Sequence, residues 1–107
     1  WLASAHGTDT ARSINIDVAT FTAGTHYPDG YLKSGLPLKK VAAGRYGLWS
    51  NGDTDPIEGH LFTATKVPAG ATVVVGALHW HGAVLVAKLP TAVNAAGQAT
   101  AKSIRYF

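Results

Sequence analysis

The sequence predicts an all-β protein, built as a small β-barrel or β-clip-like domain with one short helix and an extended N-terminal arm. Three observations predict this class. The chain has 107 residues, the size of a single domain. Short segments rich in β-branched and aromatic residues recur along it, separated by turns that contain glycine or proline. Strands at this close spacing form a small barrel or clip, and they leave no room for the crossover helices of a parallel sheet.

The first 18 residues predict an arm that carries one strand. Residues 1–12 have no apolar period and are rich in alanine, serine and threonine, which is typical of a flexible segment. Residues 13–18 alternate, so that Ile14, Ile16 and Val18 share one face of a half-exposed strand. Such a strand near a chain end is suited to pairing with an exposed sheet edge of another protein.

A linker with aromatic side chains follows the arm. Residues 21–35 are dense in turn formers and include three aromatic residues, Phe21, Tyr27 and Tyr31. Two interpretations are open, since these rings either anchor the linker to a partner or fasten it to its own domain. We therefore divide the chain into an arm and linker, residues 1–35, and a β domain, residues 36–107, which we expect to fold without residues 1–18.

The remaining predicted elements lie in the β domain. Strands are expected at residues 38–43, 46–49, 57–65, 71–78, 83–89 and 103–107. One helix is expected at residues 91–96, because Pro90 precedes this segment and Gly97 follows it. Trp49 and Phe62 fall within the β patterns, so both are expected in the core.

Composition favours an oligomer. Hydrophobic residues make up 47% of the chain and charged residues 14%, which is apolar for a small monomer that must cover its own surface. A domain of this size buries only about 60 to 65% of its unfolded surface. Without cysteine it has neither disulfides nor a cysteine zinc site, so additional stability is expected from association. The longest apolar stretch, residues 73–89, is interrupted by glycine, histidine and lysine, so we expect no membrane span and no signal peptide.

The charges are unevenly distributed along the chain. Residues 1–58 contain six acidic and five basic residues, a net charge of −1, whereas residues 59–107 contain four basic residues and no acid, a net charge of +4. These four cations are scattered singly and lack the clustering of a phosphate-binding stripe. The distribution therefore favours an acidic protein surface, and not nucleic acid, as the partner.

The segment His79-Trp80-His81 is the best candidate for a metal or catalytic site, because residues two apart on a strand share a face. His60 or an acidic residue would supply a third ligand. The other interpretation is that both histidines pack at a subunit interface or face solvent. We expect this second arrangement, because no His-Glu metal motif accompanies the pair.

Two further kinds of site are weaker candidates. Residues 51–58, NGDTDPIE, have the oxygen density of a calcium loop, but Pro56 stands where the EF-hand pattern requires glycine and Glu58 comes four residues too early. A surface turn is expected there. The serine residues lack a G-x-S-x-G elbow, and no glycine-rich phosphate loop occurs. We therefore expect no enzyme activity, no metal and no cofactor.

An ordered series of segments extends through most of the chain. The run FTAGTHYPDGYLKSGLPLKKVAAGR is followed by YGLWSNGDTDPIEGHLF and later by VLVAKLP. The residues that define the series are Ser34, Gly35, Leu38, Lys40, Val41, Tyr46, Gly47, Asp53, Gly59, Leu61, Leu89 and Pro90. The series resembles the lambda-type head decoration protein D family, particularly its members from phages of actinobacteria, over roughly residues 16–107.

The resemblance implies a capsid decoration, or cement, protein. Such a protein is made in the host cytoplasm and sits on the virion, as a homotrimer at three-fold and quasi-three-fold positions on the outer surface of the expanded head. The arm would lie against the major capsid protein, and three linked arms would hold together through individually weak contacts. The candidate capsid-binding residues are then Ile14, Ile16, Val18, Phe21, Tyr27 and Tyr31.

Two alternative functions are open. A carbohydrate-binding or host-adhesion module on the virion surface would use Trp80, Trp49 and Tyr46 as stacking platforms. A small metal-dependent enzyme would use His79 and His81.

Overall fold

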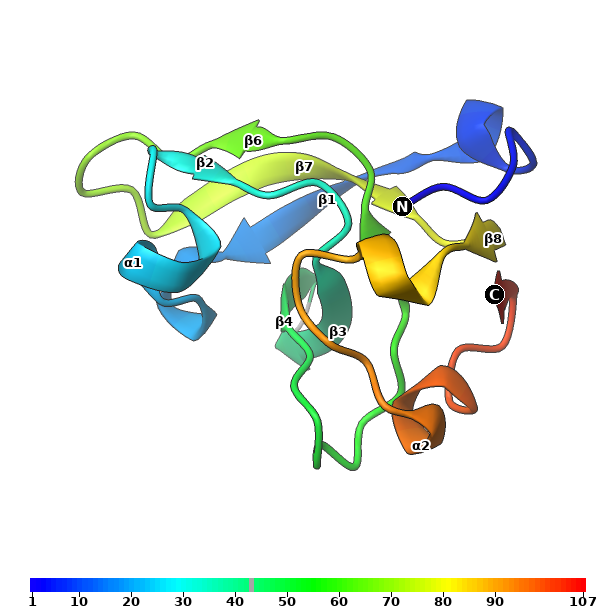
Figure 1. The fold of residues 1–107 in the computed structure, drawn as a ribbon. Coiled ribbons are helices and arrows are strands. Elements are labelled where there is room, and N and C mark those ends of the chain that lie inside the picture. Colours follow the sequence, from blue (N-terminus) through cyan, green and yellow to red (C-terminus); the bar gives the residue numbers. More distant parts are fainter. Residues whose placement is uncertain (43) are drawn as a thin grey trace.

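A closed five-stranded barrel forms the centre of the protein (Figure 1). In the computed structural model, which describes residues 1–42 and 44–107, the strand order is β1-β4-β3-β5-β7. The strands are β1 (Arg12–Asp17), β3 (Pro37–Ala42), β4 (Arg45–Leu48), β5 (Gly59–Leu61) and β7 (Val73–His79). The predicted all-β class, with a small barrel, is confirmed.

Strand β1 belongs to the barrel and is not part of a free arm. It pairs antiparallel with β7 from Arg12 opposite Leu78 to Asp17 opposite Val73. On its other side it runs parallel to β4, with Ile16 opposite Tyr46. β1 is thus paired along its whole length with β7 and at Asn15 and Ile16 with β4, so it is a strand of the domain's own sheet. The expected division at residue 35 is therefore corrected, because the barrel closes only through β1.

The first residues of the chain also pack on the domain, where a flexible segment was expected. Leu2 forms a β-bridge with Val84, and the N–H of Leu85 donates a hydrogen bond to the carbonyl of Trp1 at 2.6 Å. The indole N–H of Trp1 donates to Ser34 Oγ at 2.7 Å. A short 3₁₀ turn, η1 (Thr8–Thr10), leads from this segment into β1. These contacts give the segment a defined place that its composition does not indicate.

Two small sheets lie outside the barrel. Strand β2 (Tyr31–Leu32) pairs antiparallel with β6 (Thr65–Lys66), and the two lie side by side above β7 in Figure 1. Strand β8 (Gly82–Val84) runs parallel to β9 (Ile104–Tyr106). Because residues 1–3 contact the other side of β8, the two ends of the chain flank this strand.

The core has two parts. The first fills the barrel and contains fully buried leucines from several strands together with Ile16 of β1. The second contains Trp49, Ile57, Val84, Val93, Ala101 and Ile104. Helix α2 (Ala95–Gln98) packs so closely on this part that a β-carbon at Gly97 would overlap the Trp49 ring. Trp49 is thus a core residue, as expected, whereas Phe62 is only half-buried.

Several elements differ from their predicted bounds. The strand expected at 57–65 is divided into β5 and β6, and the one expected at 83–89 ends with β8 and continues as a 3₁₀ turn, η3 (Val86–Lys88). The strand expected at 38–43 corresponds to β3, and its last residue lies outside the described residues. Helix α2 starts later than expected because the Asn94 side chain accepts the N–H of Gly97 at 2.8 Å and caps the helix there.

The segment between β1 and β2, expected to be an irregular linker, contains helical turns. These are η2 (Val18–Thr20) and a second short helix, α1 (Ala23–His26). The expectation of a single helix is therefore wrong. Helix α1 ends with a buried His26 whose Nδ1 accepts the N–H of Thr22 at 2.8 Å. This hydrogen bond joins the residue before the helix to its last residue. A helix of four residues is not stable alone, so such a contact helps to hold it.

Candidate interaction surface

Four of the six residues predicted to bind a capsid are core residues of this domain. Ile14, Ile16, Val18 and Phe21 are only 6%, 0%, 6% and 7% exposed. Their alternation does mark an apolar face, but that face is turned into the barrel. A partner would reach these side chains only if the barrel opened. The expectation that they contact another protein is therefore corrected.

The two tyrosines of the segment have different environments. Tyr27 is half-buried against the barrel core, so it fastens the segment to its own domain. Tyr31 lies on β2 opposite Lys66 and is 44% exposed. Of the six predicted residues, Tyr31 is thus the one with an exposed side chain.

His79 and His81 do not form a joint site. His79 is fully buried, with its ring stacked on Phe62 at 5.7 Å between centroids and edge-on to Trp1 at 5.5 Å. His81 lies beyond the end of β7 and contacts His6, with ring centroids 4.6 Å apart. Among residues 1–42 and 44–107, no three His, Cys, Asp or Glu side chains are grouped closely enough to hold a metal ion.

His60 of β5 lies opposite His79 of the neighbouring strand β7, and its surroundings favour its neutral form. Its Nδ1 is 2.8 Å from the carbonyl of Gly35, and its Nε2 is 2.7 Å from the hydroxyl of Tyr106. Burial lowers the pKa of His60 to about 4. Burial also lowers the pKa of His79, and nearby His81 and His6 lower it further. Burial raises the pKa of the Tyr106 hydroxyl, which therefore stays protonated.

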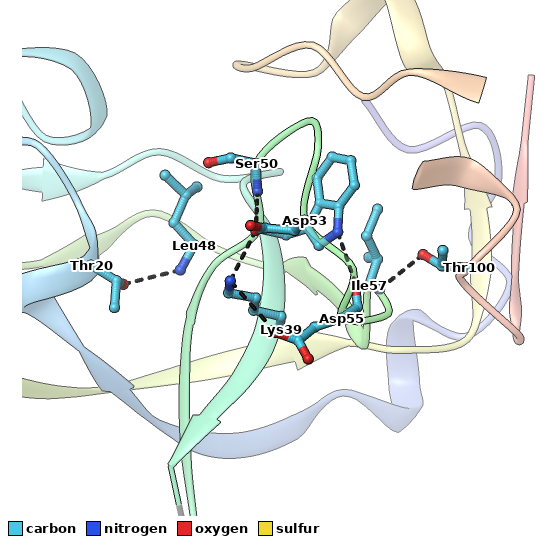
Figure 2. Close-up of polar contacts among 9 residues, drawn as sticks. Thr20, Lys39, Leu48, Ser50, Asp53, Asp55, Ile57 and Thr100 are labelled. Carbon is cyan, nitrogen blue, oxygen red and sulfur yellow. Dashed lines mark hydrogen bonds and ion pairs between the residues drawn. The ribbon is translucent and has the colours of Figure 1, made fainter. Parts of the chain in front are cut away.

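The acidic loop between β4 and β5 is held by its own hydrogen bonds (Figure 2). Asp53 Oδ2 accepts the N–H of Ser50 at 2.8 Å and the Lys39 ammonium at 3.0 Å. These two bonds lower the pKa of the Asp53 carboxyl. The Trp49 indole N–H donates to the backbone carbonyl of Asp55 at 3.1 Å. The loop is thus a structural turn, as its sequence predicts. Asp53 Oδ2 already has two hydrogen-bond donors, Ser50 and Lys39.

The described surface has a groove that no local sequence pattern predicts. It has a volume of about 570 Å³ and is lined by residues of β8 and β9 together with Ser4 and His6. Lys102, Arg105 and Phe107 also line it. The one sequence signal that bears on it is the excess of basic residues after residue 58. Position along the chain does not reveal it, because residues about 100 positions apart in sequence line it together.

Two of the three proposed carbohydrate-stacking residues are inaccessible. Trp49 and Tyr46 are 2% and 8% exposed. Trp80 is half-buried, and its indole N–H donates to the Thr10 carbonyl at 2.8 Å. These rings do not form a platform on the described surface.

No helix within the described residues is both long and apolar enough to span a membrane. Comparison of the chain with known protein families, with curated proteins and with solved structures finds no match.

Proposed function

We propose that the protein is a phage capsid decoration protein that binds as a homotrimer to the outer surface of the head and stabilises the shell. The ordered series of residues from Ser34 to Pro90 supports the choice of a capsid as the partner. The span from Ser34 to Pro90 contains four of the five barrel strands, β3, β4, β5 and β7, so the resemblance concerns most of the barrel apart from β1.

The structural observation that carries the proposal is the amount of apolar surface left exposed by so small a domain. Five large apolar side chains are at least one-third exposed: Leu2, Tyr31, Val75, Leu85 and Phe107. Leu2 and Leu85 both lie beside β8, on chain segments that are hydrogen-bonded to each other. Exposed apolar side chains are available for contacts with other proteins. The two kinds of contact that we propose, between copies and with the shell, would cover them.

Cementing needs no chemical reaction. A protein that binds only the assembled shell stabilises that shell by mass action, by about 2.7 kcal/mol per site at one hundred times its dissociation constant. A trimer that contacts several capsid subunits must dissociate before those subunits separate. The free energy is then summed over many sites on one particle.

The direct test is binding to empty expanded heads of the phage that encodes the chain. We expect the protein to sediment as a trimer, to co-sediment with heads, and to raise the temperature at which filled heads release DNA. Retention on a glycan surface without binding to heads would favour the adhesion alternative. Equal DNA-release temperatures for decorated and undecorated heads would refute the cementing role.

A further inference from the structure

We propose that the groove over β8 and β9 binds an extended, acidic segment of a different protein. The identification of that protein as the capsid rests on the proposed function, whereas the chemistry of the segment follows from the groove itself.

The groove lies over a ribbon in which residues 1–3 and β9 flank β8. Residues of β8 and β9 line it along these strands, together with Ser4, His6 and His81 from the neighbouring segments. Ala83 of β8 lies opposite Arg105 of β9, and both line the groove. His6 and His81, which also line it, are in contact. A groove that follows strands in this way suits an extended peptide better than a compact ligand.

The charged side chains that line the groove are all basic. Its lining includes Lys102 and Arg105, both exposed, and contains no acidic residue. In the described part of the chain, ion pairs join Lys39 to Asp53 and Asp55 and Lys40 to Glu58, but none involves the two groove cations. These cations therefore have no internal counter-charge, and a carboxylate-bearing ligand would supply one.

A second copy of this chain is a poor source of that counter-charge. Three of its six acidic residues, Asp53, Asp55 and Glu58, lie near lysines of their own chain. Asp17 and Asp29 accept backbone N–H groups of their own turns. The sixth, Asp9, is a single exposed carboxylate, so one described copy offers the groove no cluster of unpaired carboxylates, and we assign the acidic segment to another protein.

Apolar contact adds a second element of recognition. Phe107 is 66% exposed and follows the last residue of β9, and like Arg105, two residues before it, it lines the groove. An extended ligand would place an acidic side chain against Arg105 and an apolar side chain, two residues away, against Phe107. Strand β9 also pairs with β8 alone among the described strands, so no described strand pairs with its other edge.

A peptide-binding measurement tests the groove without any phage particle. The probe is a fluorescein-labelled, amidated peptide with two repeats of Glu-Ser-Leu-Ser, which presents glutamate and leucine alternately on one face when extended. The control peptide has glutamine in place of glutamate. We expect the intact protein to bind the glutamate peptide at least tenfold more tightly at 50 mM salt, measured by fluorescence anisotropy. Absence of binding, or equal binding of both peptides, would overturn the proposal.

Variants separate the groove from net charge. Replacement of both groove cations, Lys102→Gln with Arg105→Gln, is compared with Lys33→Gln with Lys66→Gln, which removes the same charge from exposed positions outside the groove. The groove variant is expected to lose at least tenfold in affinity and the control variant less than twofold. Equal losses would show non-specific attraction and refute the site. Tighter binding of a 20-nucleotide single-stranded DNA, lost in the groove variant, would assign the groove to nucleic acid instead.

The same variants on heads distinguish the groove from the proposed function. If wild-type protein binds heads and the groove variant binds as well as the control variant, the groove is not the capsid contact and the inference fails. If wild-type protein binds the glutamate peptide through the groove but does not bind heads, the inference stands and the capsid function fails.

Discussion

Acidification should destabilise the protein through His60, which lies in the barrel wall. An unfolded histidine has a pKa near 6.5, whereas burial lowers the pKa of His60 to about 4. Between these two values the unfolded chain binds a proton that the folded chain does not, so the free energy of unfolding falls as pH falls. One such proton lowers the free energy of unfolding by about 1.4 kcal/mol per pH unit. A change from pH 6.5 to 4.5 therefore lowers it by roughly 2 to 3 kcal/mol. The lowered pKa values of His26 and His79 act in the same direction.

Urea unfolding, followed by tryptophan fluorescence at fixed protein concentration and ionic strength, measures this loss. With a slope of about 1 to 2 kcal/mol per molar urea, the midpoint should fall by about 1 to 3 M. His60→Gln keeps an amide that can bond to Gly35 and Tyr106, but it does not titrate. We expect the acid sensitivity of this variant to be smaller by the His60 contribution. Thr54→Gln, at an exposed position that does not titrate, serves as the control and should keep the wild-type response.

If His60→Gln loses as much stability between pH 6.5 and 4.5 as the wild-type protein does, the reasoning from burial is wrong. A wild-type midpoint that does not change over this range would refute it as well.

Three further predictions concern the fold. Deletion of residues 1–18 should leave an unfolded chain by circular dichroism, because it removes β1 from the closed barrel; a cooperative thermal transition in the deletion variant would contradict this. Gly97→Ala should lower the free energy of unfolding by about 1 to 3 kcal/mol, because the new methyl group overlaps the Trp49 ring; an unchanged melting temperature would show that α2 moves away without cost. Asp53→Ala should lower the free energy of unfolding by about 0.5 to 1.5 kcal/mol, since the Ser50 N–H and the Lys39 ammonium lose their acceptor. The exposed Asp9→Ala should change the free energy of unfolding by less than about 0.5 kcal/mol. Equal effects in urea unfolding would argue against the loop network.

Local sequence pattern predicted the strands that obey it. The alternation over residues 13–18 and the apolar run at 71–78 each correspond to a strand of the barrel, β1 and β7. Pattern also indicated that the loop 51–58 is a turn, since Pro56 and the early Glu58 do not fit a calcium loop. These properties depend on residues a few positions apart, so they can be inferred without knowing which segments meet.

Pattern did not indicate what the apolar face of β1 contacts. Ile14, Ile16 and Val18 would alternate in the same way against a partner's sheet or against their own barrel. The pairing of β1 with β7, about 60 residues away, decides between the two. The sequence also does not show where a strand ends if a tertiary contact is involved. Strand β8 ends at Val84, and the N–H of the next residue, Leu85, donates to the carbonyl of Trp1 before η3 begins.

The sequence by itself therefore determined the class of the fold, the position of most strands and the excess of positive charge after residue 58. Only the tertiary structure decided that β1 is a core strand, that His60 and His79 are buried together, and that the two chain ends enclose a basic groove. The physical reason is that periodicity shows which side chains share a face, whereas burial and charge pairing depend on which distant segment covers that face.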